Sequence, residues 1–398
     1  MKKYFFSLAM AAILLTACNN DDDKITIERE GELKGAITGN RTLNADTAYV
    51  LTGTLSVKEG GKLTIPAGTI IKGSTSASVS QAYSKYIMVE RGAQIDIQGT
   101  PDEPVVMTSE DQYPGGWGGL IINGYAPISG ANENKALNEG STEVNSNIKY
   151  GGDQENDNSG SVQYLILEYT GSKSSEDKEH NGLTLNGVGN GTTIENIYVK
   201  DGADDGIEWF GGSVNVTNLL VVNSDDDMFD VTEGWTGTLD NAYGIWEPDF
   251  VSSEGDPRGV EADGNLDGNG PTHYYQSDFT MTNITIVTNA ENSDDSGENG
   301  FGGLMHDALK IRRGARATIT NCLVKGEGTI RDLIDLSDQK GAAADGTAIE
   351  LNYAGLSTDL TGEVINGEDD VDATINVDAP GQTGCDTSVF DWTGYSFY

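Results

Sequence analysis

Short apolar alternations separated by glycine dominate the chain. In residues 49–73, YVLTGTLSVKEGGKLTIPAGTIIKG, apolar and polar side chains alternate in runs of three or four residues, and glycines end the runs. A period of two residues is typical of a β-strand, whereas an amphipathic helix repeats every 3.6 residues. The pattern therefore predicts an all-β repeat protein built from short strands.

A longer repeat predicts how these strands stack. The segment from Thr193, TIENIYVKDGADDGIEWFGG, aligns with NVTNLLVVNSDDDMFDVTEGW from Asn215 at an offset of 22 residues. The aligned pairs are Ile194 with Val216, Asn196 with Asn218, Ile197 with Leu219, Val199 with Val221, Ile207 with Phe229 and Glu208 with Asp230. This period matches one rung of a parallel β-helix, in which equivalent residues lie about 4.8 Å apart. We expect a side-chain amide ladder at Asn196 and Asn218, with Asp240 at the next step.

The limits of the pattern predict the domain organisation. The strand pattern returns in residues 279–290 and 317–328, and polar stretches near 129–160 and 252–277 interrupt it. We expect a parallel β-helix domain over residues 35–340, from which these two stretches project as loops able to carry a binding surface. Residues 341–398 lose the pattern and are expected to cap the open end.

The N-terminus predicts export. Lys2 and Lys3 precede a short apolar run and then LTAC, which ends at Cys18, so the segment is typical of a secretory signal rather than a membrane span. It resembles a bacterial lipoprotein signal, which implies removal of residues 1–17 and lipidation of Cys18. The alternative is an ordinary secretory signal that contains a cysteine.

Residues 18–34, in which NNDDDK directly follows Cys18, are predicted to form a solvated acidic tether. The acidic stretch resembles the surface-export signal of Bacteroidetes lipoproteins, which implies a lipid-anchored protein on the outward face of the outer membrane. A plain charged spacer would instead leave the protein facing the periplasm.

Charge and cysteine content narrow the possible partners. The formal net charge of −39 argues against nucleic acid and anionic lipid as partners and favours divalent cations. Once Cys18 is lipidated, Cys322 and Cys385 remain. They either pair in an oxidising compartment or stay as two separate buried thiols.

Two acidic segments are candidate calcium sites. The 22-residue offset places six acidic residues on two adjacent rungs, and oxygen ligands of this kind suit calcium. They are Asp204, Asp205, Glu208, Asp226, Asp227 and Asp230. The alternative is that these aspartates accept backbone hydrogen bonds in tight turns.

The second segment, DGNLDG, offers Asp263, Asn265 and Asp267 in the spacing that opens a calcium loop. An EF-hand is rejected because Tyr274 stands where its bidentate glutamate belongs. A different calcium loop and a merely acidic, glycine-rich loop both remain open.

A cluster of aromatic residues is the third candidate site. Exposed rings could stack on sugars or anchor a protein partner, or they could fill the interior. The candidates for exposure are Trp235, Tyr243, Trp246, Tyr274 and Tyr275, whereas alternation with Ile207 predicts that Trp209 is buried. The basic run LKIRRGAR, residues 309–316, either binds an anion or offsets carboxylates on neighbouring rungs.

Six motifs in chain order carry a family resemblance. They are YIMVERGAQIDIQGTPDEPVVMTS, GGWGGLIING, HNGLTLNGVGNGTTIENIYV, DDGIEWFGGSVN, SDDDMFDVTEGW and ALKIRRGARATITNCLV. Together, over residues 35–336, they resemble a family of Bacteroidetes β-helix surface lipoproteins. The resemblance implies a right-handed parallel β-helix and an outer-membrane location, but no common activity.

For function, we expect a non-enzymatic surface lipoprotein, stabilised by calcium, that binds a glycan or nutrient, or an outer-membrane partner such as a transporter. A carbohydrate-active enzyme, either a glycoside hydrolase or a polysaccharide lyase, is the alternative, and a structural or adhesive role is a third. A hydrolase needs only two carboxylates at the correct separation, and the sequence offers too many to choose between. No basic residue lies between Lys200 and Arg258, which disfavours a lyase.

Overall fold

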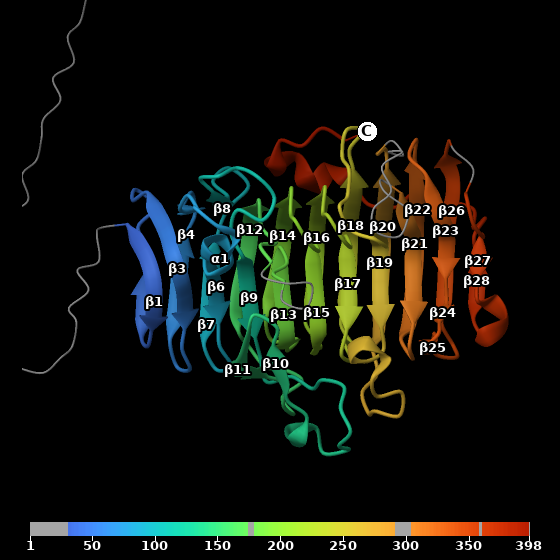
Figure 1. Ribbon diagram of the computed structural model, residues 1–398, viewed down its shortest axis with the longest axis horizontal. Coiled ribbons are helices and arrows are strands. Elements are labelled where there is room, and N and C mark those ends of the chain that lie inside the picture. The colour runs from blue at the N-terminus through green and yellow to red at the C-terminus, as the bar shows by residue number, and fades with distance from the viewer. Residues whose placement is uncertain (1–30, 174–178, 291–303, 358–359, 398) are drawn as a thin grey trace, which may run out of the picture. The chain divides into compact units, whose positions relative to one another are not determined.

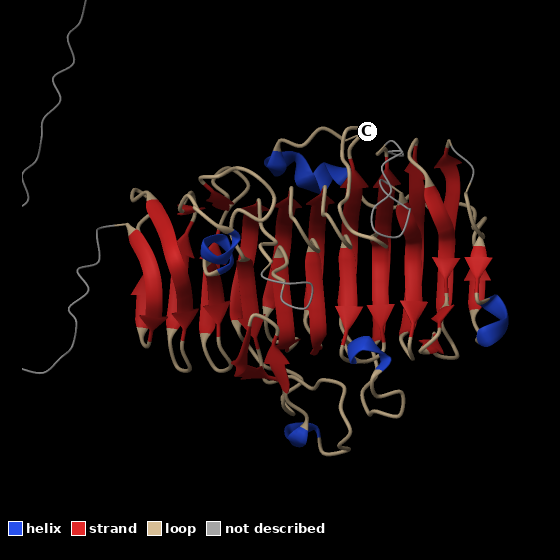
Figure 2. Ribbon diagram, viewed as in Figure 1, coloured by secondary structure: helices blue, strands red, loops and turns tan. Residues whose placement is uncertain are grey.

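The computed structural model describes residues 31–173, 179–290, 304–357 and 360–397. Most of its strands pair in parallel with strands one rung before and one rung after them (Figures 1 and 2). The strands thus stack as a parallel β-helix, which confirms the predicted fold class. The predicted signal, Cys18 and most of the predicted tether lie outside the described residues.

One ladder of strands, called the site sheet below, positions the candidate functional residues. It contains β6 (Tyr86–Val89), β9 (Gly119–Asn123), β13 (Leu183–Val188), β15 (Ile207–Gly212), β17 (Phe229–Thr232), β19 (Arg258–Asp263), β21 (Met305–Arg312), β23 (Ile330–Asp335) and β27 (Ile365–Asn366).

A second ladder is formed by longer strands that bend in the middle. It contains β12 (Gly160–Glu168), β14 (Thr193–Lys200), β16 (Asn215–Val222), β18 (Thr238–Trp246), β20 (Asp278–Thr288), β22 (Arg316–Gly326), β26 (Ala348–Leu356) and β28 (Thr374–Asn376). The N-terminal rungs add β1 (Glu32–Ile37), β2 (Asn40–Thr42), β3 (Tyr49–Val57), β4 (Lys62–Pro66), β5 (Ile70–Gly73), β7 (Gln94–Gln98) and β8 (Val105–Ser109).

The bend is at an asparagine in five of these strands, β14, β16, β18, β20 and β22, whereas Tyr164 takes this place in β12. Asn196 and Asn218 both have a φ of 59°, a left-handed conformation that asparagine tolerates better than other residues with a Cβ atom. The side-chain amide of Asn218 donates to Asn196 at 2.9 Å, so the predicted amide ladder is confirmed. The expected next step, Asp240, is wrong by one residue: Asn241 donates to Asn218 at 3.0 Å, because this rung is one residue longer.

The predicted register of the neighbouring rungs is also confirmed. Ile194 pairs with Val216, Ile197 with Leu219 and Val199 with Val221, and all six side chains are buried. Stacked apolar side chains of this kind fill the interior, and burying each one stabilises the fold by about 1.5–3 kcal/mol.

Two insertions project at the lower edge of the view in Figure 1. The first holds η1 (Lys135–Leu137) and the antiparallel hairpin of β10 (Gly140–Thr142) and β11 (Asn145–Tyr150). The second is shorter than predicted: part of residues 252–277 is strand β19, whose Val260 is buried, and the projecting part contains η2 (Leu266–Gly268).

The smaller elements lie at the ends and along the side of the β-helix. They are α1 (Val79–Tyr83), the antiparallel pair β24 (Ser337–Asp338) and β25 (Gly341–Ala342), η3 (Glu368–Asp370) and η4 (Thr387–Thr393). Phe390 of η4 is fully buried against the outer faces of Leu220 and Ile245, so the last residues cover a side of the solenoid rather than its open end (Figure 1). Cys322 and Cys385 are separate free thiols. Among the described residues, no helix is long and apolar enough to cross a membrane.

Candidate metal centre

Two columns of polar side chains run along the site sheet. The register repeats on five rungs, from DDGIE at residues 204–208 to RDLID at 331–335, and its fourth residue is always buried in the interior. The strand column consists of Glu208, Asp230, Glu261, Lys310 and Asp335. The turn column lies three residues earlier in each rung. It consists of Asp205 and Asp227, which precede their strands, and of Arg258, Asp307 and Asp332, which lie within β19, β21 and β23. Neighbours in a column are about 4.8 Å apart, so their charges interact strongly.

The first two rungs of these columns face a cavity of about 420 Å³. Ten of its fifteen lining residues are acidic: Glu143, Glu179, Asn181, Asp204, Asp205, Glu208, Phe210, Asp226, Asp227, Asp230, Thr232, Glu261, Asp263, Leu266 and Arg312. The structure thus brings together the six carboxylates predicted from the 22-residue offset. Glu143 comes from the β10–β11 hairpin and Leu266 from η2, so both insertions reach the rim.

Within the cavity, the carboxylates form three groups of three. In each group, one oxygen per residue lies within 4.8 Å of an oxygen of both others. The groups are Asp204, Asp205 and Asp226; Asp205, Glu208 and Asp230; and Asp227, Asp230 and Glu261. Two oxygens bound to the same calcium ion are at most about 5 Å apart, because the Ca–O distance is 2.3–2.6 Å. Each group therefore has the spacing of a calcium ligand set.

Two of these carboxylates are buried with no direct partner. The carboxyl groups of Asp204, which is 4% exposed, and of Asp227, which is 3% exposed, form no ion pair within the described part of the chain, and Oδ1 of Asp227 accepts no hydrogen bond there. Oδ1 of Asp226 is likewise without a partner there. A buried carboxylate in this state is strongly unfavourable unless it is protonated or neutralised by a cation.

The electrostatics of the cavity agree with this geometry. Burial, followed by repulsion from Glu179 and Asp226, raises the pKa of Asp204 well above its ordinary value. Burial and neighbouring carboxylates likewise raise the pKa values of Asp205 and Glu208. The same holds for Asp226, Asp227 and Asp230, although Arg258 opposes the rise at the first two. The carboxylates of the cavity thus outnumber the cations near them, Lys173, Arg258 and Arg312, and a divalent cation would supply further positive charge.

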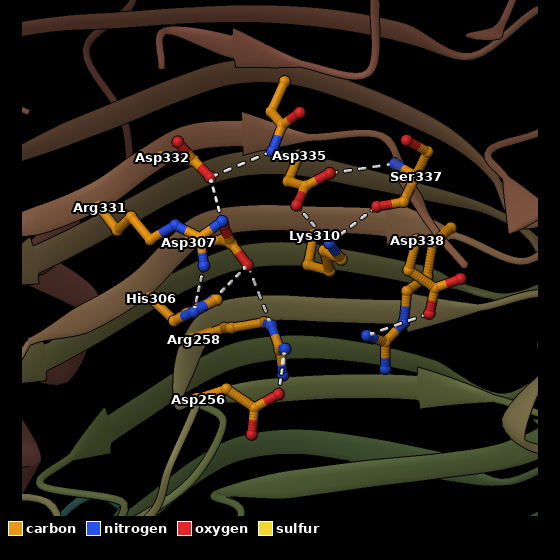
Figure 3. Close-up of polar contacts among 12 residues, drawn as sticks. Asp256, Arg258, His306, Asp307, Lys310, Arg331, Asp332, Asp335, Ser337 and Asp338 are labelled. Atoms are coloured by element: carbon orange, nitrogen blue, oxygen red, sulfur yellow. Dashed lines mark hydrogen bonds and ion pairs between the residues drawn. The ribbon is translucent and has the colours of Figure 1, made fainter. Parts of the chain in front are cut away.

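Arg258 is the first basic residue along the two columns (Figure 3). Its guanidinium contacts Asp307 at 3.1 Å and Glu261 at 2.9 Å. Further along, Lys310 pairs with Asp335. The LKIRRGAR run, which includes Lys310, therefore offsets carboxylates on neighbouring rungs.

A fourth carboxylate group, Asp307, Asp332 and Asp335, also has ligand spacing. Here each carboxylate has a cation beside it, Asp332 being 3.3 Å from Arg331 (Figure 3). Burial alone would raise the pKa of Asp307, but His306 and Arg258 together lower it. This group is a neutralised ion network and does not need a metal.

Two of the three predicted ligands of the calcium loop at residues 263–268 have other partners. Asp263 accepts from Arg312 at 2.8 Å and from Arg313 at 2.6 Å. Asn265 is fully buried, and its side chain bonds to Gln276 and to the amide of Gly270. The side chain of Asp267 lies outside the described part of the structure.

Most of the predicted aromatic surface is buried instead. Trp235, Tyr243 and Trp246 are fully enclosed, so their prediction as an exposed platform is wrong. Trp235 stacks on Trp209 at 4.5 Å in the interior, where Trp209 is buried as predicted, and Trp246 donates to the carbonyl of Ser224. In short strands, the sequence alternation does not determine whether a ring points inward or outward. Here the large rings fill interior space that aliphatic side chains would leave empty.

Of the five predicted aromatic residues, only Tyr274 and Tyr275 reach the surface. Tyr274 is 42% exposed and donates to Glu133 at 2.9 Å. Tyr275 is half-buried beneath the ammonium of Lys135. They join the two insertions to each other.

Glu261 and Arg312 line the cavity but were not predicted to do so. The signal for Glu261 is the sequence VEADG, which repeats the apolar–acidic–apolar pattern of IEWFG and FDVTEG. Asn181, which donates to Glu208, precedes a GLT that begins the previous rung in the same register.

Comparisons with known proteins place the chain in a family. No curated protein matches it. Among solved structures, the catalytic domain of a GH87 α-1,3-glucanase in complex with tetrasaccharides is similar at 12% identity and a TM-score of 0.32. That match covers 88% of this chain, which spans 63% of the glucanase chain. The family of pectate-lyase-like β-helix domains matches residues 35–395, and the chain belongs to it.

Proposed function

We propose that this protein is a non-enzymatic β-helix lipoprotein that binds divalent cations, calcium above all, in its acidic cavity. The observation that carries the proposal is the cluster of buried carboxylates in the cavity, in which Oδ1 of Asp226 and Oδ1 of Asp227 have no hydrogen-bond partner among the described residues. Ligand spacing up to 4.8 Å and an all-oxygen donor set favour calcium over transition metals, which prefer nitrogen or sulfur.

The cellular setting is part of the same proposal. Lipidation of Cys18 would hold the β-helix at the outer membrane, facing the exterior, where calcium is plentiful enough for sites of modest affinity. The two insertions at the cavity rim, with exposed Tyr274, are then the surface that meets a glycan, a nutrient or a membrane partner such as a transporter.

Calcium titration of the purified protein by calorimetry tests the proposal. We expect saturable binding with a Kd between about 1 μM and 1 mM, the range from sensor sites to extracellular modules. Replacing Asp204 and Asp226 together with asparagine should weaken it, because both belong to one ligand group. Asp225→Asn is the matched control: Asp225 accepts a hydrogen bond from Ser253 at 2.7 Å and belongs to none of the groups. Absence of binding at about 10 mM calcium, beyond the weakest such modules, would refute the proposal.

A carbohydrate-active enzyme is the second candidate, and one contact favours it. The carboxyl groups of Glu208 and Asp230 are hydrogen-bonded to each other in the cavity, and the pKa of each is raised. Paired carboxyl groups serve as acid and nucleophile in retaining glycosidases at a separation of about 5–5.5 Å, so Glu208 and Asp230 would have to move apart to act in this way.

A lyase is less well supported by the same cavity. Arg312 does reach it, contrary to the expectation of an acidic centre without basic residues. However, Arg312 is paired with Glu261 and Asp263, and although burial lowers its pKa, these carboxylates raise it further, so it does not serve as a base.

Incubation with a glycan library separates the two candidates. We expect no product from the wild-type protein, because the cavity walls offer no exposed ring on which a sugar could stack, Phe210 being 3% exposed. Release of product from any glycan, abolished by Glu208→Gln, would replace the non-enzymatic proposal with a hydrolase.

A further inference from the structure

We propose that the cavity holds two divalent cations that share Asp205 as a bridging ligand. This inference rests on the proposed cation binding and adds the number of ions and their arrangement. It follows from the membership of the ligand groups: Asp205 belongs both to the group with Asp204 and Asp226 and to the group with Glu208 and Asp230.

The first cation lies among Asp204, Asp205 and Asp226, before the strands of the site sheet begin. Here Asp204 is nearly fully buried, lines the cavity and has no hydrogen bond or ion pair among the residues described. Oδ1 of Asp226 is also buried without a partner. These oxygens keep their lone pairs for a metal, whereas a turn aspartate uses some of its lone pairs for backbone amides.

The second cation lies among Asp205, Glu208 and Asp230. Glu208 and Asp230 are in register on the adjacent strands β15 and β17, and their carboxyl groups are in contact. Asn181 donates to Oε2 of Glu208 and so fixes the orientation of that carboxylate. Two carboxylates in contact repel each other when both are ionised, and a cation bound to both removes the repulsion.

Asp205 is built to bridge the two positions. Its Oδ1 accepts the backbone N–H of Asp227 at 2.9 Å, which holds the side chain between the two rungs. A carboxylate offers about four lone-pair directions on two oxygens, so one amide bond leaves enough for two cations. Burial, followed by repulsion from Asp204, raises its pKa, in keeping with a central place in the cluster.

The third group does not take a further ion. The Oε1 atom of its member Glu261 has no hydrogen bond, but the guanidinium groups of Arg258 and Arg312 lie 2.9 Å and 2.5 Å from it as counter-charges. A cation there would lie beside these two guanidinium groups. Arg258 is also close enough to Asp227, another member of the group, to lower its pKa. Two divalent cations also bring four positive charges to the five carboxylates of the first two groups.

Ion counting on matched variants of the full protein tests this arrangement. Wild-type protein should bind about two calcium equivalents, measured by calorimetry and native mass spectrometry. Asp204→Asn should remove only the first and Glu208→Gln only the second. Asp205→Asn should weaken both, by about tenfold or more, as loss of a metal-site partner commonly does. Asp225→Asn, from the same acidic run, should leave both equivalents unchanged.

Melting in chelator shows whether each variant is folded. Since each variant removes a buried negative charge, we expect it to melt at or above the wild-type temperature without calcium. A lack of binding to wild-type protein would refute the proposed function itself. One bound equivalent, or an Asp205→Asn variant no weaker than Asp204→Asn, would overturn the bridged pair while leaving cation binding intact.

Discussion

Replacing Arg258 with alanine is expected to lower the free energy of unfolding by about 3–5 kcal/mol, the effect of leaving a buried charge unpaired. Arg258 is 4% exposed and contacts Asp307, Glu261 and Asp256. Without it, the fully buried Asp307 keeps His306 as a direct partner and Lys310 as a more distant cation, and the acidic cavity loses one of the cations at its border. Urea unfolding at neutral pH in the presence of calcium measures the change.

An exposed ion pair on the same β-helix provides the control. Arg316 lies 2.9 Å from Asp278, and both side chains are about half exposed. Exposed pairs contribute at most about 1 kcal/mol, so Arg316→Ala should have little effect. Equal losses in the two variants would show that Arg258 contributes no more to the free energy of unfolding than an exposed ion pair does.

The fold was predictable because a solenoid repeats its local constraints. Each rung must bury the same positions, so an offset of 22 residues is enough to align Ile194 with Val216 and Asn196 with Asn218. Where a rung gains a residue, as before Asn241, the fixed offset fails. The projecting loops carry no repeat, and their structure could not be predicted from periodicity.

The site was predictable on two rungs and no further. Glu208 and Asp230 follow the repeat, but β18 and an insertion separate Asp230 from Glu261 by more than one period. The same insertion also moves Arg258, which ends the acidic part of the turn column, out of the 22-residue register. Partners also matter: Asp263 has a calcium-like spacing in sequence, yet Arg312 and Arg313 come from a rung 49 and 50 residues away and occupy it.

Without calcium, the free energy of unfolding is expected to fall steeply as pH rises from about 4 to 8. The six cavity carboxylates ionise near pH 4 in the unfolded chain. Burial and mutual repulsion raise their pKa values in the folded protein. Between these values the folded state binds more protons, so the free energy of unfolding falls as pH rises. Each carboxyl group that stays protonated only in the folded state contributes about 1.4 kcal/mol per pH unit.

Calcium should remove most of this dependence, because bound ions neutralise the ionised carboxylates in place of protons. At a calcium concentration 100 times the Kd, each site adds about 2.7 kcal/mol to the free energy of unfolding. Thermal melts at several pH values, with calcium or with chelator, measure the difference. Groups outside the ion sites should titrate in the same way with and without calcium, so they do not contribute to this difference. Glu233, whose pKa burial raises to about 7, is one such group.

The variant Asp204→Asn with Glu208→Gln is the control, since it removes one carboxylate from each of the two ion positions. In chelator it should lose less stability than wild-type protein between pH 4 and 8, and calcium should stabilise it less. A wild-type melting transition that chelator leaves unchanged at pH 8 would contradict the prediction, because six crowded, ionised carboxylates would then be tolerated without a cation. In that case water and Lys173, Arg258 and Arg312 would have to supply the compensation, and the pKa values of the cavity would lie close to ordinary ones.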